Sequence, residues 1–156
     1  MKKLLFAGAA LLMLCACGER EYMAYEGLPL DMPTSQFVDS LKARGLVIDT
    51  ANTDGVVISL VKPDSKAYNL SIQNNNDTIL VIQETFSATT NDSTRQLWQQ
   101  KRDQYAELYG MPDYKSKGED RKEAVWKGDK GQLVISLANT YTPTLTVYFD
   151  TRLEER

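Results

Sequence analysis

The sequence predicts an α+β fold built from two tandem units, each a helix followed by a meander of antiparallel strands, with the helices packed on one face of the sheet. Two stretches have the apolar spacing of an amphipathic helix, residues 34–44 and a longer one that ends at residue 109, and a glycine follows each of them. Short β-branched or alternating stretches, separated by turn residues, come after each predicted helix. Because helix and meander bury their apolar faces against each other, we place the first unit at residues 32–88 and the second at 89–150.

The N-terminal residues predict a leader with a lipid-attachment site. Two lysines follow the initial methionine, and the apolar run over residues 4–14 is too short to span a membrane. The Leu-Cys-Ala-Cys sequence of residues 14–17 then resembles the lipobox of bacterial lipoprotein signals. The resemblance implies that residues 1–16 are a signal peptide and that Cys17 receives a diacylglycerol before it becomes the first residue of the mature protein.

Lipid attachment at Cys17 predicts where the protein lies. Residues 17–31 lack periodicity, and we expect them to form the acylated cysteine and a tether whose Tyr22 and Tyr25 can dock on the folded part. By resemblance to lipoprotein sorting rules, Gly18 is not the aspartate that retains a lipoprotein in the inner membrane. The expected location is therefore the outer membrane, on its periplasmic or its surface side. Acylation of Cys15 instead, or an ordinary secretory leader, are the alternatives.

The composition excludes several kinds of chemistry. The chain has no histidine, and its two cysteines both fall in or beside the leader. Histidine-based catalysis, a free thiol nucleophile and a cysteine-ligated metal are therefore excluded from the mature domain, and we expect no metal or cofactor. The formal net charge of −3 argues against nucleic acid as a partner, because nucleic-acid binding requires clustered lysine and arginine.

In the first unit, the elements follow from turn residues and alternation. The helix over residues 34–44 is followed by a short strand at 46–48, a polar turn and a β-branched strand at 55–61. A second alternating run is centred on residues 68–72. The strand at 78–86 contains four consecutive aliphatic residues, which predicts a central position in the sheet with burial on both faces.

In the second unit, residues 89–94 form a polar linker whose last residues can cap a helix that runs to residue 109. The inward arc of this helix is expected to hold Leu97, Trp98, Tyr105, Leu108 and Tyr109. A charged loop at 114–122 and a frayed tail at 151–156 are expected. Three strands follow the loop, at 124–126, 133–137 and 145–149. Their inward residues are predicted to be Leu133, Ile135, Leu137, Leu145, Val147 and Phe149.

Two short motifs resemble a known family. Residues 27–34, Gly-Leu-Pro-Leu-Asp-Met-Pro-Thr, run into the first helix, and residues 108–112, Leu-Tyr-Gly-Met-Pro, close the second. They resemble the SmpA/OmlA, or BamE-like, family of small lipoproteins, and the overall layout resembles the tandem fold of the β-lactamase-inhibitor protein. The resemblance implies an envelope-assembly accessory or a protein-binding module that is not an enzyme.

Two ionisable residues fall on predicted inward faces. Lys101 lies within the apolar arc of the second helix; either its ammonium group extends past the core into solvent, or the lysine is partly buried and poised for chemistry in a cleft. Glu84 lies between Ile82 and Phe86 on its strand, so it is either buried with them or exposed by a bulge or by the sheet rim.

Four further residues are candidate binding or modification sites. Tyr114 in the charged loop and Tyr141 at a hairpin tip are expected outside the core, where tyrosines bind proteins or sugars or simply pack on neighbouring turns. Thr50 and Ser93 lie in Asp-Thr-Ala and Asp-Ser-Thr sequences, which resemble the acceptor of some Gram-negative O-glycosylation systems.

The function that the sequence favours is a non-enzymatic interaction module. It is expected to contact the lipid bilayer through acylated Cys17 and to bind an envelope protein. The alternative is a surface-exposed lipoprotein that binds a ligand or glycan through a concave patch lined by Tyr114 and Tyr141.

Overall fold

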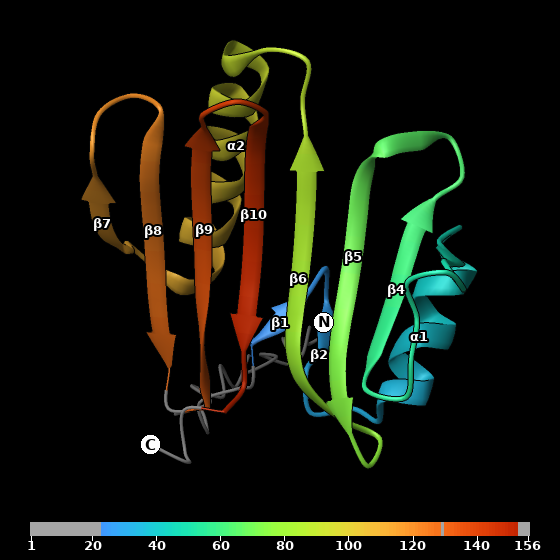
Figure 1. The fold of residues 1–156 in the computed structure, drawn as a ribbon. Coiled ribbons are helices and arrows are strands. Elements are labelled where there is room, and N and C mark those ends of the chain that lie inside the picture. The colour runs from blue at the N-terminus through green and yellow to red at the C-terminus, as the bar shows by residue number, and fades with distance from the viewer. Residues whose placement is uncertain (1–22, 129, 153–156) are drawn as a thin grey trace, which may run out of the picture.

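The fold is one antiparallel sheet of eight strands with two helices and a short hairpin on one side (Figure 1). The computed structural model describes residues 23–128 and 130–152. The strands of the large sheet are β3 (Val47–Ile48), β4 (Val57–Lys62), β5 (Ser65–Asn75), β6 (Thr78–Ser87), β7 (Asp113–Ser116), β8 (Arg121–Gly128), β9 (Gly131–Asn139) and β10 (Pro143–Asp150). Their order across the sheet is β3-β4-β5-β6-β10-β9-β8-β7.

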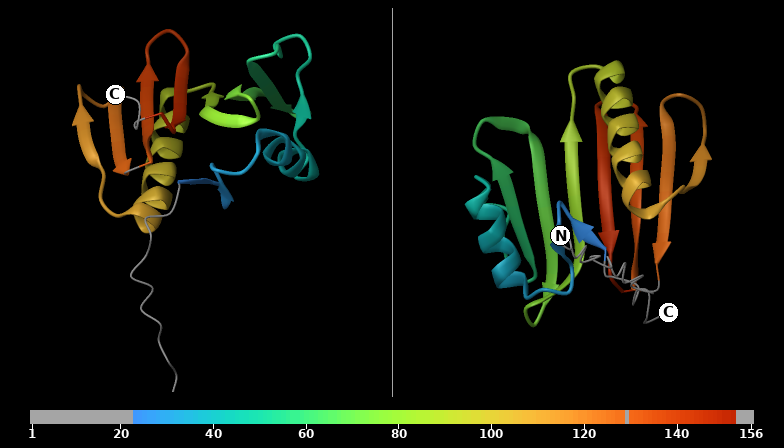
Figure 2. Two further views of the ribbon diagram at one scale, coloured as in Figure 1. Left: turned by 90° about the horizontal axis from the view of Figure 1, so that it is seen from below. Right: turned by 180° about the vertical axis from the view of Figure 1, so that it is seen from behind.

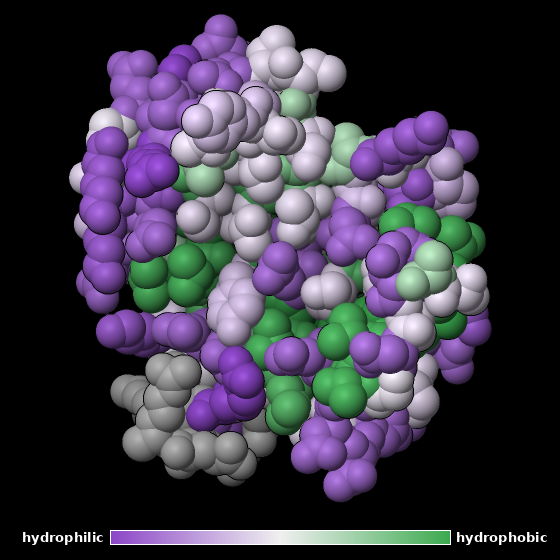
Figure 3. All heavy atoms as spheres, in the orientation of Figure 1, coloured by the Kyte–Doolittle hydropathy of each residue, from purple (hydrophilic) through white to green (hydrophobic). Residues whose placement is uncertain are grey.

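One face of the sheet is covered and the other is open. The helices α1 (Thr34–Ala43) and α2 (Asn91–Tyr109) lie on the same face, and the hairpin of β1 (Ala24–Tyr25) and β2 (Leu28–Pro29) fits between them (Figure 2). The opposite face carries mostly hydrophilic and neutral side chains (Figure 3). No helix in the described part of the chain is long and apolar enough to cross a membrane.

The prediction of an α+β fold with two tandem helix-plus-meander units is wrong. Strands make up 48% of the structure and helices 22%. The last strands of the two expected units, β6 and β10, pair with each other from Ser87–Thr144 to Val81–Asp150. This pairing joins all eight strands into one sheet with one continuous core. The order of helices and strands along the chain carried no information on which strand edges meet.

The apolar alternation of the last two strands is confirmed. All six residues predicted to point inward from β9 and β10 are buried in the core. Trp98 and Tyr105 of α2 are buried as expected, but Leu108 is 64% exposed. Tyr105 and Tyr109 stack on each other with ring centroids 6.2 Å apart, so these two rings occupy the space over the core at this end of α2.

The central position predicted for β6 is confirmed, but for a different reason. β6 lies between β5 and β10, and one of its faces belongs to the open side of the sheet. The register shifts so that Gln73 pairs with Val81 and Asn74 with Ile79, which leaves Leu80 as an extra residue. Because the bulge shifts which residues face inward, both Ile79 and Ile82 lie in the core although they are three residues apart. The run of aliphatic residues therefore reflects this shift in the inward–outward alternation along the strand.

The segment predicted as a tether contains the β1–β2 hairpin. Tyr25 is 1% exposed and packs edge-on against Phe149 with ring centroids 5.9 Å apart. The Ala24 N–H donates to the Tyr109 hydroxyl over 2.9 Å. The β1–β2 hairpin is therefore inserted between the helices and forms part of the core.

Candidate functional site

The predicted site residues do not come together in space. Cys17 lies outside the described residues. Thr50 is exposed in the loop between β3 and β4, whereas Ser93 is exposed in the first turn of α2 rather than in a loop. Tyr114 is 53% exposed on β7, and Tyr141 is completely exposed in the β9–β10 turn. A fully exposed side chain packs on nothing, so Tyr114 and Tyr141 do not line one concave patch.

Glu84 and Lys101 belong to a buried polar cluster. The Glu84 side chain is 1% exposed, and its Oε2 accepts a hydrogen bond from Lys101 Nζ over 3.1 Å. Its Oε1 accepts from the Tyr25 hydroxyl over 2.8 Å, and the Tyr25 and Tyr68 hydroxyls lie 3.0 Å apart. The exposed alternative for Glu84 and the solvent-extended alternative for Lys101 are therefore both wrong. Lys101 is only 12% exposed because its ammonium group turns inward to the carboxylate.

The geometry of this cluster favours a structural role over a catalytic one. Both carboxylate oxygens of Glu84 are occupied, and burial together with the Glu84 charge raises the pKa values of Tyr25 and Tyr68 above their usual range, so both phenols stay neutral. The neighbouring cavity, of about 440 Å³, is lined by Tyr68 and other residues but by neither Glu84 nor Lys101. The cluster joins the N-terminal hairpin to β5, β6 and α2.

A second group of residues surrounds β7, which we call the β7 corner: strand β7 with the cavity on each of its two faces. β7 is held at both ends. The Trp126 indole N–H donates to the Gly110 carbonyl over 2.8 Å just before the strand, and the Lys117 N–H donates to the Arg121 carbonyl over 2.8 Å just after it. The strand is therefore positioned before any partner arrives.

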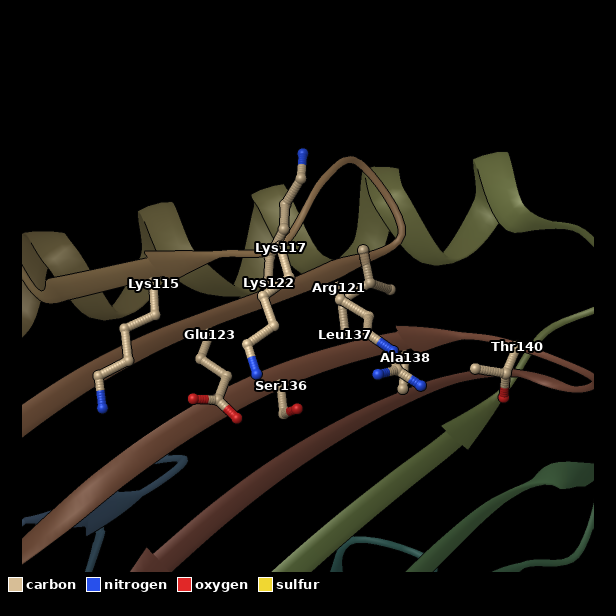
Figure 4. A pocket seen from close by; sticks show the side chains of 9 residues that line it. All are labelled: Lys115, Lys117, Arg121, Lys122, Glu123, Ser136, Leu137, Ala138 and Thr140. Atoms are coloured by element: carbon tan, nitrogen blue, oxygen red, sulfur yellow. The ribbon is translucent and has the colours of Figure 1, made fainter.

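On the open face, the β7 corner has a basic groove. Its volume is about 540 Å³. Lys115, Glu123 and Ser136 are neighbours in register on β7, β8 and β9, and their side chains point the same way (Figure 4). Arg121 extends over β9 at Ala138, its partner in register. The lining contains four cationic side chains and one carboxylate: Lys115, Lys117, Arg121, Lys122 and Glu123.

The groove combines these cations with one carboxylate, Glu123, which lies beside Lys115 in register. Lys115, Lys117 and Arg121 form no ion pair with any described residue. By contrast, Arg95 of α2 pairs with Asp120 over 2.8 Å and also with Asp92. A concave surface with unpaired cations attracts anionic groups, and it does so in a chain whose net charge is negative.

On the helix face, the β7 corner has an aromatic cavity of about 340 Å³. Tyr114 lies against Trp98 of α2 with ring centroids 5.8 Å apart. The Lys122 ammonium group lies 5.5 Å from the Trp98 ring centroid and the Arg102 guanidinium lies 5.2 Å from it. Rings with cations at their faces and an exposed edge are typical of protein-binding surfaces.

Between these two cavities, the outer edge of β7 is free. Residues of an antiparallel strand bond alternately to one neighbour and to the other. Because Lys117 bonds to Arg121, Lys115 and Asp113 also direct their backbone groups towards β8. The N–H and C=O groups of Tyr114 and Ser116 therefore point outward, and no described residue bonds to them.

The opposite edge of the sheet is mostly covered by a loop. β3 pairs with only the last part of β4, at Val61 and Leu60. Beyond it, the Ser59 carbonyl accepts from the Asp49 N–H, the Ser59 N–H donates to Thr53 Oγ1, and Asp54 bonds to both backbone groups of Val57. Backbone N–H groups and side chains of the loop thus satisfy the outer groups of β4. Because β3 has only two residues, β7 is the longer free edge among the described strands.

Comparisons with protein-family models, curated proteins and solved structures find no match. Strand β7 was not predicted because residues 113–116 are all exposed and show no apolar alternation. The available signal was the turn chemistry of residues 116–120 (Ser-Lys-Gly-Glu-Asp), which is typical of a hairpin turn and implies a strand before it.

Proposed function

We propose that this protein is a non-enzymatic interaction module, held at the outer membrane by an acylated Cys17, which binds an envelope protein at the β7 corner. The observation that carries the proposal is a preformed free strand edge flanked by a basic groove on one face and an aromatic cavity on the other. The closed geometry of the Glu84 cluster supports a binding role over catalysis. The resemblance to the SmpA/OmlA family points to the same class of function and stays a prediction.

The position of the anchor suits a partner at the membrane. The Met23 side chain lies 3.7 Å from the position that a Cβ on Gly128 would occupy, at the end of β8. Six residue steps separate Cys17 from Met23, and an extended chain spans at most about 3.5 Å per residue. Acylation of Cys17 would thus hold this end of β8 within roughly 20 Å of the lipid surface, and β7 pairs with the same strand.

Site-specific photocrosslinking in cells tests the binding site. A benzoylphenylalanine in place of Tyr114 should give a discrete adduct with an envelope protein, whereas the same group in place of Lys66, which is exposed on β5, should not. Adducts of equal yield at both positions, or none at either, would count against the β7 corner as a binding site.

The anchor has its own test. Cys17→Ser should release the protein from the membrane fraction and greatly reduce the Tyr114 adduct, because the partner is expected at the membrane. Protease treatment of intact cells then assigns the side of the outer membrane. If the Cys17→Ser protein stays in the membrane fraction, lipid attachment at this residue is wrong.

A further inference from the structure

The free edge of β7 can form backbone hydrogen bonds in one pattern. Tyr114 and Ser116 each present one N–H and one C=O outward. An extended chain lying beside them can accept two hydrogen bonds and donate two, as the next strand of a sheet does. We propose that the partner supplies an extended acidic segment that adds to β7 as a ninth strand. This inference rests on the proposed function and specifies its partner.

The charge of the corner sets the first requirement on the segment. A residue directly opposite Lys115 would form a non-hydrogen-bonded pair with it, the pair in which side chains approach most closely. Its side chain would lie on the open face, beside the unpaired charge of Lys115 and the basic groove. Aspartate or glutamate at this position and two residues away satisfies that charge.

The aromatic cavity sets the second requirement. Side chains of a strand alternate between the two faces of the sheet, so the residues between the acidic ones would lie on the helix face. There they meet Tyr114 and Trp98, with Leu108 and Met111 exposed by 64% and 90% nearby in the chain. Apolar residues fit this side, and the segment is therefore expected to alternate acidic and apolar residues.

A lysine on an edge strand can also protect the edge from pairing, and a second copy of the chain could occupy it. Self-pairing centred on Tyr114 would place Asp113 opposite Lys115 twice but would place Met111 opposite Lys117. We favour the acidic segment because it places a carboxylate opposite both Lys115 and Lys117. Self-association remains an outcome that the experiment detects.

The probe is a fluorescent peptide with the sequence Thr-Glu-Val-Glu-Val-Thr, titrated against the full chain in an uncharged detergent and followed by anisotropy. A block-ordered peptide of identical composition, Thr-Glu-Glu-Val-Val-Thr, is the control for charge alone. Lys115→Glu should weaken binding of the alternating peptide about tenfold or more. Lys66→Glu, an equal change of charge on β5, should leave binding unchanged.

Backbone methylation of the peptide separates strand addition from charge attraction. N-methylation of one alternate set of residues should abolish binding, and methylation of the other set should leave it intact, because only one set directs its N–H groups towards β7. Equal effects of the two sets, or equal binding of the block-ordered peptide, would overturn the proposal.

Two further outcomes separate this inference from the proposed function. If a heterologous adduct forms at position 114 but the alternating peptide does not bind, the corner binds a protein by another mode and strand addition is wrong. If the adduct is a second copy of this chain and light scattering shows a dimer, the acidic partner is wrong. If neither adduct nor peptide binding is found, both proposals fail.

Discussion

Replacing Lys101 by methionine would leave the buried Glu84 carboxylate without its cation. Methionine preserves the length and the packing of the lysine stem, so the change removes mainly the charge. Glu84 is 1% exposed and Lys101 is 12% exposed, so neither charge is well solvated. Breaking one side of a buried ion pair costs about 3–5 kcal/mol, and the partial exposure of Lys101 places our expectation at about 3 kcal/mol.

A double-mutant cycle isolates the interaction. Glu84→Gln retains an oxygen that can accept from the Tyr25 hydroxyl, and it removes the charge that Lys101 neutralises. The double variant Glu84→Gln/Lys101→Met therefore buries no charge at this position. We expect it to be more stable than Lys101→Met alone by about 2 kcal/mol, a sizeable share of the 5–15 kcal/mol that is typical of a domain.

Urea unfolding at neutral pH, followed by fluorescence of the two buried tryptophans, measures these differences. Lys42→Met is the matched control. Lys42 pairs with Asp39 over 3.1 Å on the surface of α1, with side-chain exposures of 50% and 75%, and such a pair contributes about 0–1 kcal/mol. The reasoning is refuted if Lys101→Met destabilises no more than Lys42→Met, or if the double variant is as unstable as the sum of the single ones.

Three further predictions concern the tyrosines and the acceptor sites. The pKa values of Tyr25, Tyr68 and Tyr105 are raised by burial, so the unfolded chain loses protons above about pH 10 that the folded chain retains. The free energy of unfolding should therefore fall above that pH, by about 1.4 kcal/mol per pH unit for each tyrosine, and Tyr25→Phe should make the fall shallower in urea titrations at several pH values. At neutral pH, Tyr105→Phe should leave the free energy of unfolding unchanged or raise it, because no described residue bonds to the buried Tyr105 hydroxyl. Tyr25→Phe should lower the free energy of unfolding by about 1–3 kcal/mol, because it removes the hydrogen bond to Glu84. Finally, O-glycosylation at Thr50 or Ser93 predicts a mature protein heavier than its lipidated polypeptide, and an intact mass that equals the lipidated polypeptide would exclude it.

Alternation predicted the inside of the sheet well where a strand has one apolar face. Leu133, Ile135 and Leu137 recur at a period of two and all are buried, as are their counterparts on β10. At β6 the run of four aliphatic residues contains a bulge at Leu80, which changes the phase within the strand. Local pattern thus predicts the face of a residue only as far as the strand stays regular.

Contacts between distant elements could not be predicted from local pattern. Glu84 is a charged residue among apolar ones on its strand. Its partners, Lys101 on α2 and Tyr25 in the N-terminal hairpin, lie far from it in the sequence, so its burial could not be predicted from neighbouring residues. The pairing of β6 with β10, which makes one sheet from the two expected units, depends on edges that carry no distinguishing sequence. β7 was taken for part of a loop because all its residues are exposed and show no apolar alternation, so the free edge of the sheet was not predicted either.

The two ends of the sheet show why the free edge of β7 is informative. Exposed apolar side chains occur at both ends, with Val47 at 44% and Val56 at 56% beside β4, so exposure alone does not distinguish them. The difference lies in the backbone. At β4, Asp54 and a loop threonine bond to the outer N–H groups, whereas the outer groups of Tyr114 and Ser116 have no such partners among the described residues. An unpaired edge promotes association between chains. A strand held at both ends, whose outer edge lies open beside a basic groove and the tilted rings of Trp98 and Tyr114, therefore supports the proposed pairing partner over protection of the edge alone.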